Sequence, residues 1–195
     1  MTIVEITKLG ILGGTFDPPH IGHLILAQSA IEKFQLDKIL FMPAARQPHK
    51  QNQEVTSAEI RLRLLKLAVK GNSRFEISDI EIKRSGVSYT CDTLKELSNI
   101  YLKARLYLII GGDNINDIET WKNPEQIFSM AQVIAATRPD SKPECLYMDR
   151  IDIFNMPQVD ISSTMIRKLV KHGKSIKYLV PDDIEKYIIE NNLYA

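Results

Sequence analysis

GGTFDPPHIGHL, residues 13–24, joins a segment that resembles a buried strand to one that resembles a helix. The residues before it end in the apolar run LGIL, and HLILAQSAIEKF at its end carries apolar residues at helical spacing. Gly13 and Gly14 have no Cβ, so their backbone N–H groups can approach a phosphate closely, and the N–H groups of the next helix carry partial positive charge. The stretch therefore predicts a phosphate-binding corner between a strand and a helix.

Two histidines stand in this corner. His20 and His23 are three residues apart, so in a first helical turn both rings fall on one face, near the expected phosphate. The alternative is that the Gly-Gly and Pro-Pro pairs only form an ordinary loop and that Asp17 only caps the next helix. A zinc site is a poorer alternative, because His-x-x-His supplies only two ligands. The other potential ligands are scattered without metal-site spacing: Cys91, Cys145, His49 and His172.

The composition of the 195 residues is that of a folded domain with a mixed surface. Hydrophobic residues make up 44% of the chain, and a net charge of +1 gives no sign of a nucleic-acid or membrane footprint. The two cysteines show no disulfide framework, and the opening MTIVEITK lacks a long apolar segment and a basic leader. We expect a cytoplasmic protein that binds neither nucleic acid nor membrane.

Strand-like and helix-like segments alternate along the chain. Helical patterns such as AEIRLRLLKLAVKG and DTLKELSNIYLKAR separate the strand-like runs. Those runs are 8–12, 38–42, 75–82, 106–110 and 132–136. The alternation predicts an α/β fold, a Rossmann-like, doubly wound and mainly parallel sheet with helices on both faces. We expect one domain over 1–195 with a C-terminal helical segment at about 162–195, and a ligand beyond the carboxyl ends of the strands.

Further polar residues follow the predicted strands. MPAARQPHK, residues 42–50, brings the cations Arg46 and Lys50 to the same edge, where they could neutralise phosphate or form a solvated loop. In GVSYTCDTL, residues 86–94, either Thr90 or Asp92 could cap the next helix.

Two glycines and a carboxylate end the fourth strand-like run. LIIGGDN, residues 108–114, places Gly111 and Asp113 where they could contact ribose hydroxyls or a magnesium-bound water, or form a tight turn. Trp121, the only tryptophan, has unusually polar neighbours for a core residue.

DISSTMIRKLVKHG, residues 160–173, predicts a helix capped by Ser162 and ended near Gly173. Capping needs one hydroxyl, whereas three are consecutive here, and Arg167 follows one turn beyond Ser163 and Thr164. Helix N–H groups, hydroxyls and a guanidinium together suit a triphosphate.

These motifs resemble those of known nucleotidyltransferases. HIGH resembles the (T/H)xGH signature that the superfamily shares with class I aminoacyl-tRNA synthetases, but a KMSKS-like loop, an anticodon-binding domain and a longer chain cannot be found here. SYTCDT, GGD and ISSTMIR resemble the SYTxDT, GxD and ISSTxIR elements of bacterial nicotinate-nucleotide adenylyltransferases. QPHK resembles their PPHK element, with Gln47 where proline is frequent.

The resemblance implies an enzyme of NAD biosynthesis that transfers AMP from ATP to nicotinate mononucleotide, giving deamido-NAD and pyrophosphate. ATP and nicotinate mononucleotide would be the partners, and the sequence leaves a homo-oligomer open. Mg²⁺ would accompany ATP, without a dedicated protein metal site.

The resemblance also implies roles for individual residues, with His20, His23 and Arg167 catalytic. The residues implied for ATP are Gly13, Gly14, Thr15, Phe16, His20, His23, Gly111, Asp113, Ser162, Ser163, Thr164 and Arg167. Those implied for nicotinate mononucleotide are Thr15, Lys50, Tyr89, Thr90 and Trp121, whose ring would stack on the pyridine.

Two alternatives remain at this point. Pantetheine-phosphate adenylyltransferase shares the glycine and histidine corner, although SYTCDTL and Trp121 favour a pyridine nucleotide. A regulatory module that binds nucleotide without turnover is the second, against which the histidine pair and Arg167 argue. The choice between nicotinate and nicotinamide is not readable from residue types.

Overall fold

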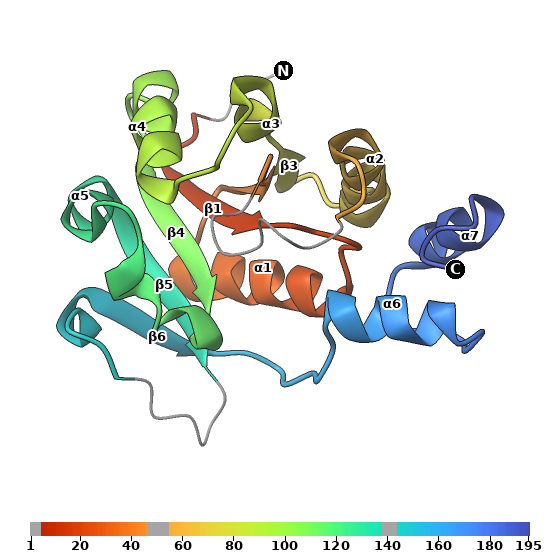
Figure 1. Cartoon of the computed structure of the whole chain (residues 1–195). Helices are drawn as coiled ribbons and strands as arrows, with labels where there is room; N and C mark the ends of the chain where they lie inside the picture. Colours follow the sequence, from red (N-terminus) through yellow and green to blue (C-terminus); the bar gives the residue numbers. More distant parts are fainter. Residues whose placement is uncertain (1–4, 47–54, 138–143) are drawn as a thin grey trace.

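The computed structural model describes residues 5–46, 55–137 and 144–195 (Figure 1). Its strands are β1 (Lys8–Gly14), β2 (Lys38–Pro43), β3 (Phe75–Ile77), β4 (Arg105–Gly111), β5 (Ala131–Thr137) and β6 (Ile151–Asn155). Its helices are α1 (Ile21–Phe34), α2 (Ala58–Val69), α3 (Ile80–Arg84), α4 (Thr90–Ile100), α5 (Pro124–Met130), α6 (Ser163–Lys171) and α7 (Asp182–Glu190). Short 3-10 helices are η2 (Gly112–Asn114), η3 (Ile118–Thr120) and η4 (Met148–Arg150).

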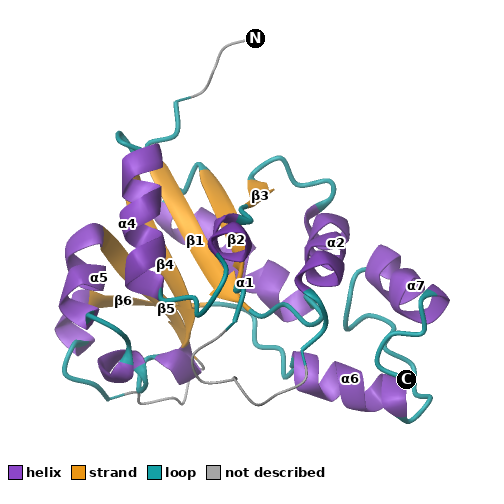
Figure 2. Cartoon of the chain, turned by 45° about the horizontal axis from the view of Figure 1, so that its top comes forward, coloured by secondary structure: helices purple, strands orange, loops and turns teal. Residues whose placement is uncertain are grey.

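The strands form one sheet in the order β3-β2-β1-β4-β5-β6, and every neighbouring pair is parallel. Helices α4 and α5 lie on one face and α1 on the other, as Figure 2 shows. The predicted Rossmann-like, doubly wound fold is therefore confirmed.

Both faces of the sheet are buried, which explains the continuous apolar runs of its central strands. Along β1, Leu9 and Ile11 pack with α4 and α5, while Leu12 points to the other face and packs with α1. Burying one such side chain contributes about 1.5–3 kcal/mol, so the two cores together hold the sheet in one register.

One strand assignment from the sequence was wrong and one strand was missed. The run 75–82 is a strand only as far as Ile77, because the chain turns at Asp79 and forms α3. Apolar alternation resumes after the turn, at Ile80 and Ile82, and this misled the prediction. Strand β6 was not expected, since it is an edge strand with only Ile151 and Phe154 buried and therefore has a weak apolar signal.

Helices α6 and α7 lie beyond the carboxyl end of β1, next to the start of α1 (Figure 1). As predicted, the hydroxyl of Ser162 caps α6, accepting from the N–H of Met165 at 3.1 Å, and Gly173 follows the helix with φ +63°. A third core joins this segment to α2 through residues such as Ile166 and Ile184. In the part of the chain that the structure describes, every helix is too short or too polar to span a bilayer.

Candidate active site

A pocket of about 740 Å³ lies at the carboxyl ends of β1 and β4, where the strand order reverses. Parallel α/β sheets bind ligands at this switch point, because the loops after the two central strands diverge to opposite faces. The segments after β1 and β4 line the pocket, and the first turns of α4 and α6 complete it.

All the residues predicted for ATP line this one pocket, although they come from three separate stretches of the chain. Of those predicted for nicotinate mononucleotide, Thr15, Tyr89, Thr90 and Trp121 line it as well. Lys50 lies outside the described residues. The fold thus gathers the predicted residues in one cavity, and their contacts suggest what each can do.

The two histidines lie stacked at the start of α1, as their spacing predicts. Their ring centroids are 3.7 Å apart, and the backbone N–H of His20 donates to Nδ1 of His23 at 3.2 Å. Gly22 makes this packing feasible, since a Cβ at that position would lie 3.0 Å from Nδ1 of His20. The glycine of HIGH therefore allows the His20 ring to lie against the backbone of the first helical turn.

Two buried polar atoms of the corner have no hydrogen-bond partner among the described residues. They are Nδ1 of His20 and Oγ1 of Thr15, and both residues line the pocket. Leaving a buried polar group unsatisfied costs roughly 1–3 kcal/mol. Because these atoms destabilise the free protein and line a pocket, they indicate that a polar ligand supplies the missing hydrogen bonds.

Burial lowers the pKa of His20 from 6.5 to about 4. The side chain is only 7% exposed, so the charged imidazolium loses most of its hydration. At neutral pH His20 is therefore an uncharged hydrogen-bonding group, and a bound polyphosphate would favour its protonation.

This lowered pKa predicts acid sensitivity of the fold. Between pH 6.5 and pH 4 the unfolded chain binds a proton at His20 that the folded chain does not, so the free energy of unfolding falls with falling pH. Acidification from pH 7 to pH 4 should cost up to about 3 kcal/mol through this residue. Denaturant unfolding across that range checks this: His20→Gln should flatten the profile, and His172→Gln, at the exposed end of α6, should not. An identical pH slope in wild type and His20→Gln would contradict the assignment.

Phe16 and Asp17 lie beneath the corner. Phe16 adopts a positive φ of 53° and turns its ring into the core against Phe41 and the edge of His23. The alternative that Asp17 caps α1 is wrong, because His20 is the N-cap residue and the carboxylate of Asp17 accepts hydrogen bonds from Thr56 and Tyr194.

The first turn of α6 docks directly on the loop after β1. The hydroxyl of Ser163 donates to the carbonyl of Pro18 at 2.8 Å. The guanidinium of Arg167 donates to the carbonyl of Asp17 at 2.7 Å and to Oγ1 of Thr164 at 3.3 Å. Helix N–H groups, hydroxyls and a guanidinium therefore meet the glycine corner at one end of the pocket, a donor set suited to phosphate.

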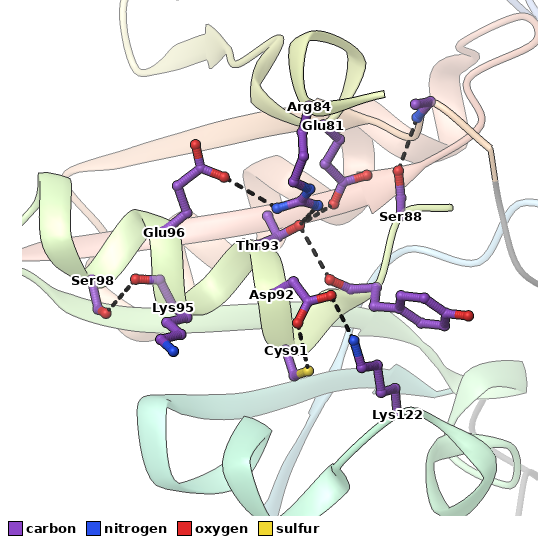
Figure 3. Close-up of polar contacts among 12 residues, drawn as sticks. Glu81, Arg84, Ser88, Cys91, Asp92, Thr93, Lys95, Glu96, Ser98 and Lys122 are labelled. Atoms are coloured by element: carbon purple, nitrogen blue, oxygen red, sulfur yellow. Dashed lines mark hydrogen bonds and ion pairs between the residues drawn. The ribbon is translucent and has the colours of Figure 1, made fainter. Parts of the chain in front are cut away.

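The first turn of α4 and the residues just before it also line the pocket. Figure 3 shows the polar contacts around this turn. The hydroxyl of Ser88 accepts from the backbone N–H of Ala45 at 3.0 Å, which fixes the approach to the helix. Tyr89 is the N-cap residue and makes no side-chain cap bond, so neither Thr90 nor Asp92 caps α4. Capping therefore does not explain the SYTCDT element.

Asp92 pairs instead with Lys122, at 2.9 Å (Figure 3). The ammonium of Lys122 also lies 4.6 Å from the centre of the Tyr89 ring. The adjacent Trp121 is half-buried at the edge of the core and lines the pocket. This cluster places two aromatic rings and a cation at the α4 end.

Glu81 is a pocket residue that the sequence reading missed. Its carboxylate is buried and accepts from the hydroxyl of Thr93 at 2.6 Å, and Arg84 donates to the same hydroxyl at 2.8 Å (Figure 3). Glu81 belongs to α3, which was taken for a strand, so no alternation pattern could place it beside α4. The only available signal was a charged residue within an apolar segment.

Gly111 ends β4 and Asp113 follows it in η2; both line the pocket, and Asp113 is exposed. No group of three or more His, Cys, Asp or Glu side chains in the described ranges could hold a metal ion.

Gly13 provides a direct test of the phosphate corner. A Cβ built at Gly13 meets no atom within 4 Å, so Gly13→Ala fits the described protein and should leave the melting temperature unchanged. If phosphate lies against this backbone, the methyl group should weaken ATP binding about tenfold, a loss of about 1.4 kcal/mol. Calorimetric titration with ATP checks this. Wild-type affinity in the variant would show that phosphate does not lie against Gly13.

Comparison with known proteins agrees with this geometry. The Cytidylyltransferase-like family matches residues 11–169. A probable nicotinate-nucleotide adenylyltransferase of Halalkalibacterium halodurans is 43% identical over 188 residues, which cover 96% of this chain and 91% of the relative. One of Exiguobacterium sibiricum is 44% identical over 188 residues, covering 96% and 99%.

Solved structures share the fold. The nicotinic acid mononucleotide adenylyltransferase of Plasmodium falciparum complexed with NaAD superposes with a TM-score of 0.81 at 22% identity, covering 96% of this chain and 97% of that one. At this identity the likeness concerns the fold alone.

Proposed function

Because the chain belongs to the nicotinate-nucleotide adenylyltransferases of the Cytidylyltransferase-like family, we propose that its pocket transfers AMP from ATP to nicotinate mononucleotide. The products are deamido-NAD and pyrophosphate, in NAD biosynthesis. One observation in particular supports the use of this pocket: Oγ1 of Thr15 and Nδ1 of His20 are buried without partners at its glycine corner.

The reaction needs no protein nucleophile. An oxygen of the mononucleotide phosphate attacks the α-phosphorus of ATP, forming one P–O bond, and the bond to the β-phosphate breaks so that pyrophosphate leaves with the electron pair. The attacking group is already anionic. The protein therefore has to align the two phosphates and stabilise the charge that passes to pyrophosphate.

The glycine corner and α6 would hold ATP. Gly13 leaves room for the phosphates, since a Cβ there would meet no atom within 4 Å, and Gly14 would contribute its backbone. His20 and His23 would donate to the α- and β-phosphates as the bond breaks. The N-terminal turn of α6 supplies hydroxyls and N–H groups, with Arg167 already anchored at 2.7 Å to the same loop. This anchoring fixes the direction of the guanidinium before ATP binds, which reduces the entropy lost on binding.

The first turn of α4 and the residues around Trp121 would hold the mononucleotide. The Trp121 ring would stack on the pyridine, and Thr90, Tyr89 and Thr15 would hold it through hydroxyl and backbone groups. Lys50 stays a proposed ligand from the sequence alone.

Mg²⁺ would enter with ATP. The exposed carboxylate of Asp113 at the pocket rim is an oxygen ligand of the kind Mg²⁺ prefers, and the phosphates would supply others. A bound Mg²⁺ offsets the charge of the triphosphate and of the departing pyrophosphate. The cytoplasmic location expected from the sequence stays a prediction.

Pyrophosphate release from ATP tests the proposal, with three acceptors compared side by side. Nicotinate mononucleotide should support release, and phosphopantetheine should not. The rate of release with nicotinamide mononucleotide, compared with the rate with nicotinate mononucleotide, measures the preference for the acid. Tight ATP binding without release for any acceptor would instead favour a regulatory module.

A further inference from the structure

The carboxylate of Asp17 lies beneath the glycine corner and is only 2% exposed. Its Oδ1 accepts from the hydroxyl of Tyr194 at 2.7 Å, and its Oδ2 accepts from the backbone N–H of Thr56 at 3.1 Å. A buried carboxylate needs such donors, because its lost hydration is otherwise uncompensated. Tyr194 therefore supplies one of the two hydrogen bonds that the structure gives this carboxylate.

Arg61 supports the same turn from α2. It is 2% exposed, and it donates to the carbonyl of Thr15 at 2.9 Å and to that of Thr56 at 3.0 Å. Its charge is also attracted to Asp17. The buried ends of Asp17 and Arg61 thus hold the backbone from Thr15 to Asp17 on its inner side.

The outer side of this turn carries the proposed ATP ligands. Arg167 and Ser163 bind the carbonyls of Asp17 and Pro18, and the residues on either side of the turn are Thr15 and His20. A shift of Asp17 would move the backbone that carries Thr15 and His20, whose side chains have the two unpartnered polar atoms. It would also move the carbonyl groups to which α6 is hydrogen-bonded.

Tyr194 is held in place by the packing of the C-terminal segment. It is half-buried against the core that joins α2, α6 and α7. The C-terminal end lies beside α6 and α7 in Figures 1 and 2. Burial and the charge of Asp17 both raise the pKa of the Tyr194 hydroxyl, so it stays a neutral donor throughout the working pH range.

We propose that Tyr194 is a positioning residue for ATP, which acts through its hydrogen bond to Asp17 to fix the turn between Thr15 and His20. The inference rests on the proposed function of this corner. ATP should be the more affected substrate, because Thr15 is the one residue of this turn that is also proposed for the mononucleotide, whose other proposed ligands lie on α4 and at Trp121.

The variant Tyr194→Phe tests the proposal, since it keeps the ring and removes only the hydroxyl. We expect the dissociation constant of ATP to rise about fivefold or more, and that of nicotinate mononucleotide, which touches this turn only through Thr15, to rise by less than half as much. Tyr178→Phe is the matched control, because Tyr178 is 81% exposed. Calorimetric titration of each ligand alone gives both constants.

A double-mutant cycle with Asp17→Ala, which removes the acceptor, tests the route of the effect. If Tyr194 acts through Asp17, adding Tyr194→Phe to Asp17→Ala should change ATP affinity by less than twofold. If Asp17→Ala does not fold, the result for Tyr194→Phe alone decides.

Three results would overturn the inference: unchanged ATP affinity with only a lower melting temperature, equal weakening of both ligands, or additive losses in the cycle. Pyrophosphate release by the wild type is measured separately. A wild type that turns over with an unaffected Tyr194→Phe would refute the positioning role and leave the proposed function intact.

Discussion

His20→Ala should lower kcat for pyrophosphate release by about 100-fold, the loss typical of a preorganised donor to developing charge. Nδ1 of His20 is buried without a partner, and Gly22 keeps the ring against the first turn of α1. Steady-state assays with both substrates saturating measure the effect, and a thermal melt establishes that the variant is folded.

The control for this variant is His172→Ala. His172 is exposed at the end of α6 and does not line the pocket, so its removal should leave kcat within twofold of wild type. Wild-type kcat in His20→Ala would take His20 out of the reaction and leave the histidine pair a packing feature of α1.

Trp121→Ala should weaken binding of nicotinate mononucleotide by about tenfold or more, because stacking of a base on an aromatic side chain contributes roughly 1–3 kcal/mol. The affinity for ATP should change by less than twofold, since Trp121 is not among the residues proposed for ATP, which come from the glycine corner, η2 and α6. Calorimetric titration with each ligand measures both values.

Trp121→Phe separates stacking from packing. It keeps an aromatic face, so it should recover most of the affinity for the mononucleotide, whereas Trp121→Leu should not. Equal losses for both ligands in Trp121→Ala, or full recovery with leucine, would count against stacking on the pyridine ring.

The central part of the fold was readable because its signals are local. The runs that became β1, β2, β4 and β5 are apolar and separated by amphipathic helices, and a parallel sheet follows from that alternation. At the two edges the signal weakens. β6 buries only two of its five residues, and after β3 the chain turns at Asp79, where the apolar alternation is interrupted before it resumes at Ile80.

The candidate site divides in the same way. Gly111 ends a strand, and His20 and Ser162 are N-cap residues, so their positions at the carboxyl edge of the sheet follow from the fold class. Glu81 and Tyr194 could not be found, because their contacts depend on how distant segments pack. The bond between Asp17 and Tyr194 joins residues 177 positions apart, and no periodicity encodes it.

Asp17 is a single residue whose role could not be predicted from the sequence. A carboxylate just before a helix is a sensible cap on sequence grounds, yet the chain places His20 at the N-cap and turns Asp17 inward. The sequence shows which residues are neighbours in the motif. The direction of each side chain depends on which groups are buried when distant segments pack together.

The most direct test of the two-ended site is a crystal structure of the wild type with deamido-NAD. We expect the diphosphate bridge to contact His20 and the backbone of Gly13, and the pyridine ring to stack on Trp121. A product bound with its pyridine ring at the glycine corner, or outside this pocket, would contradict the proposed site.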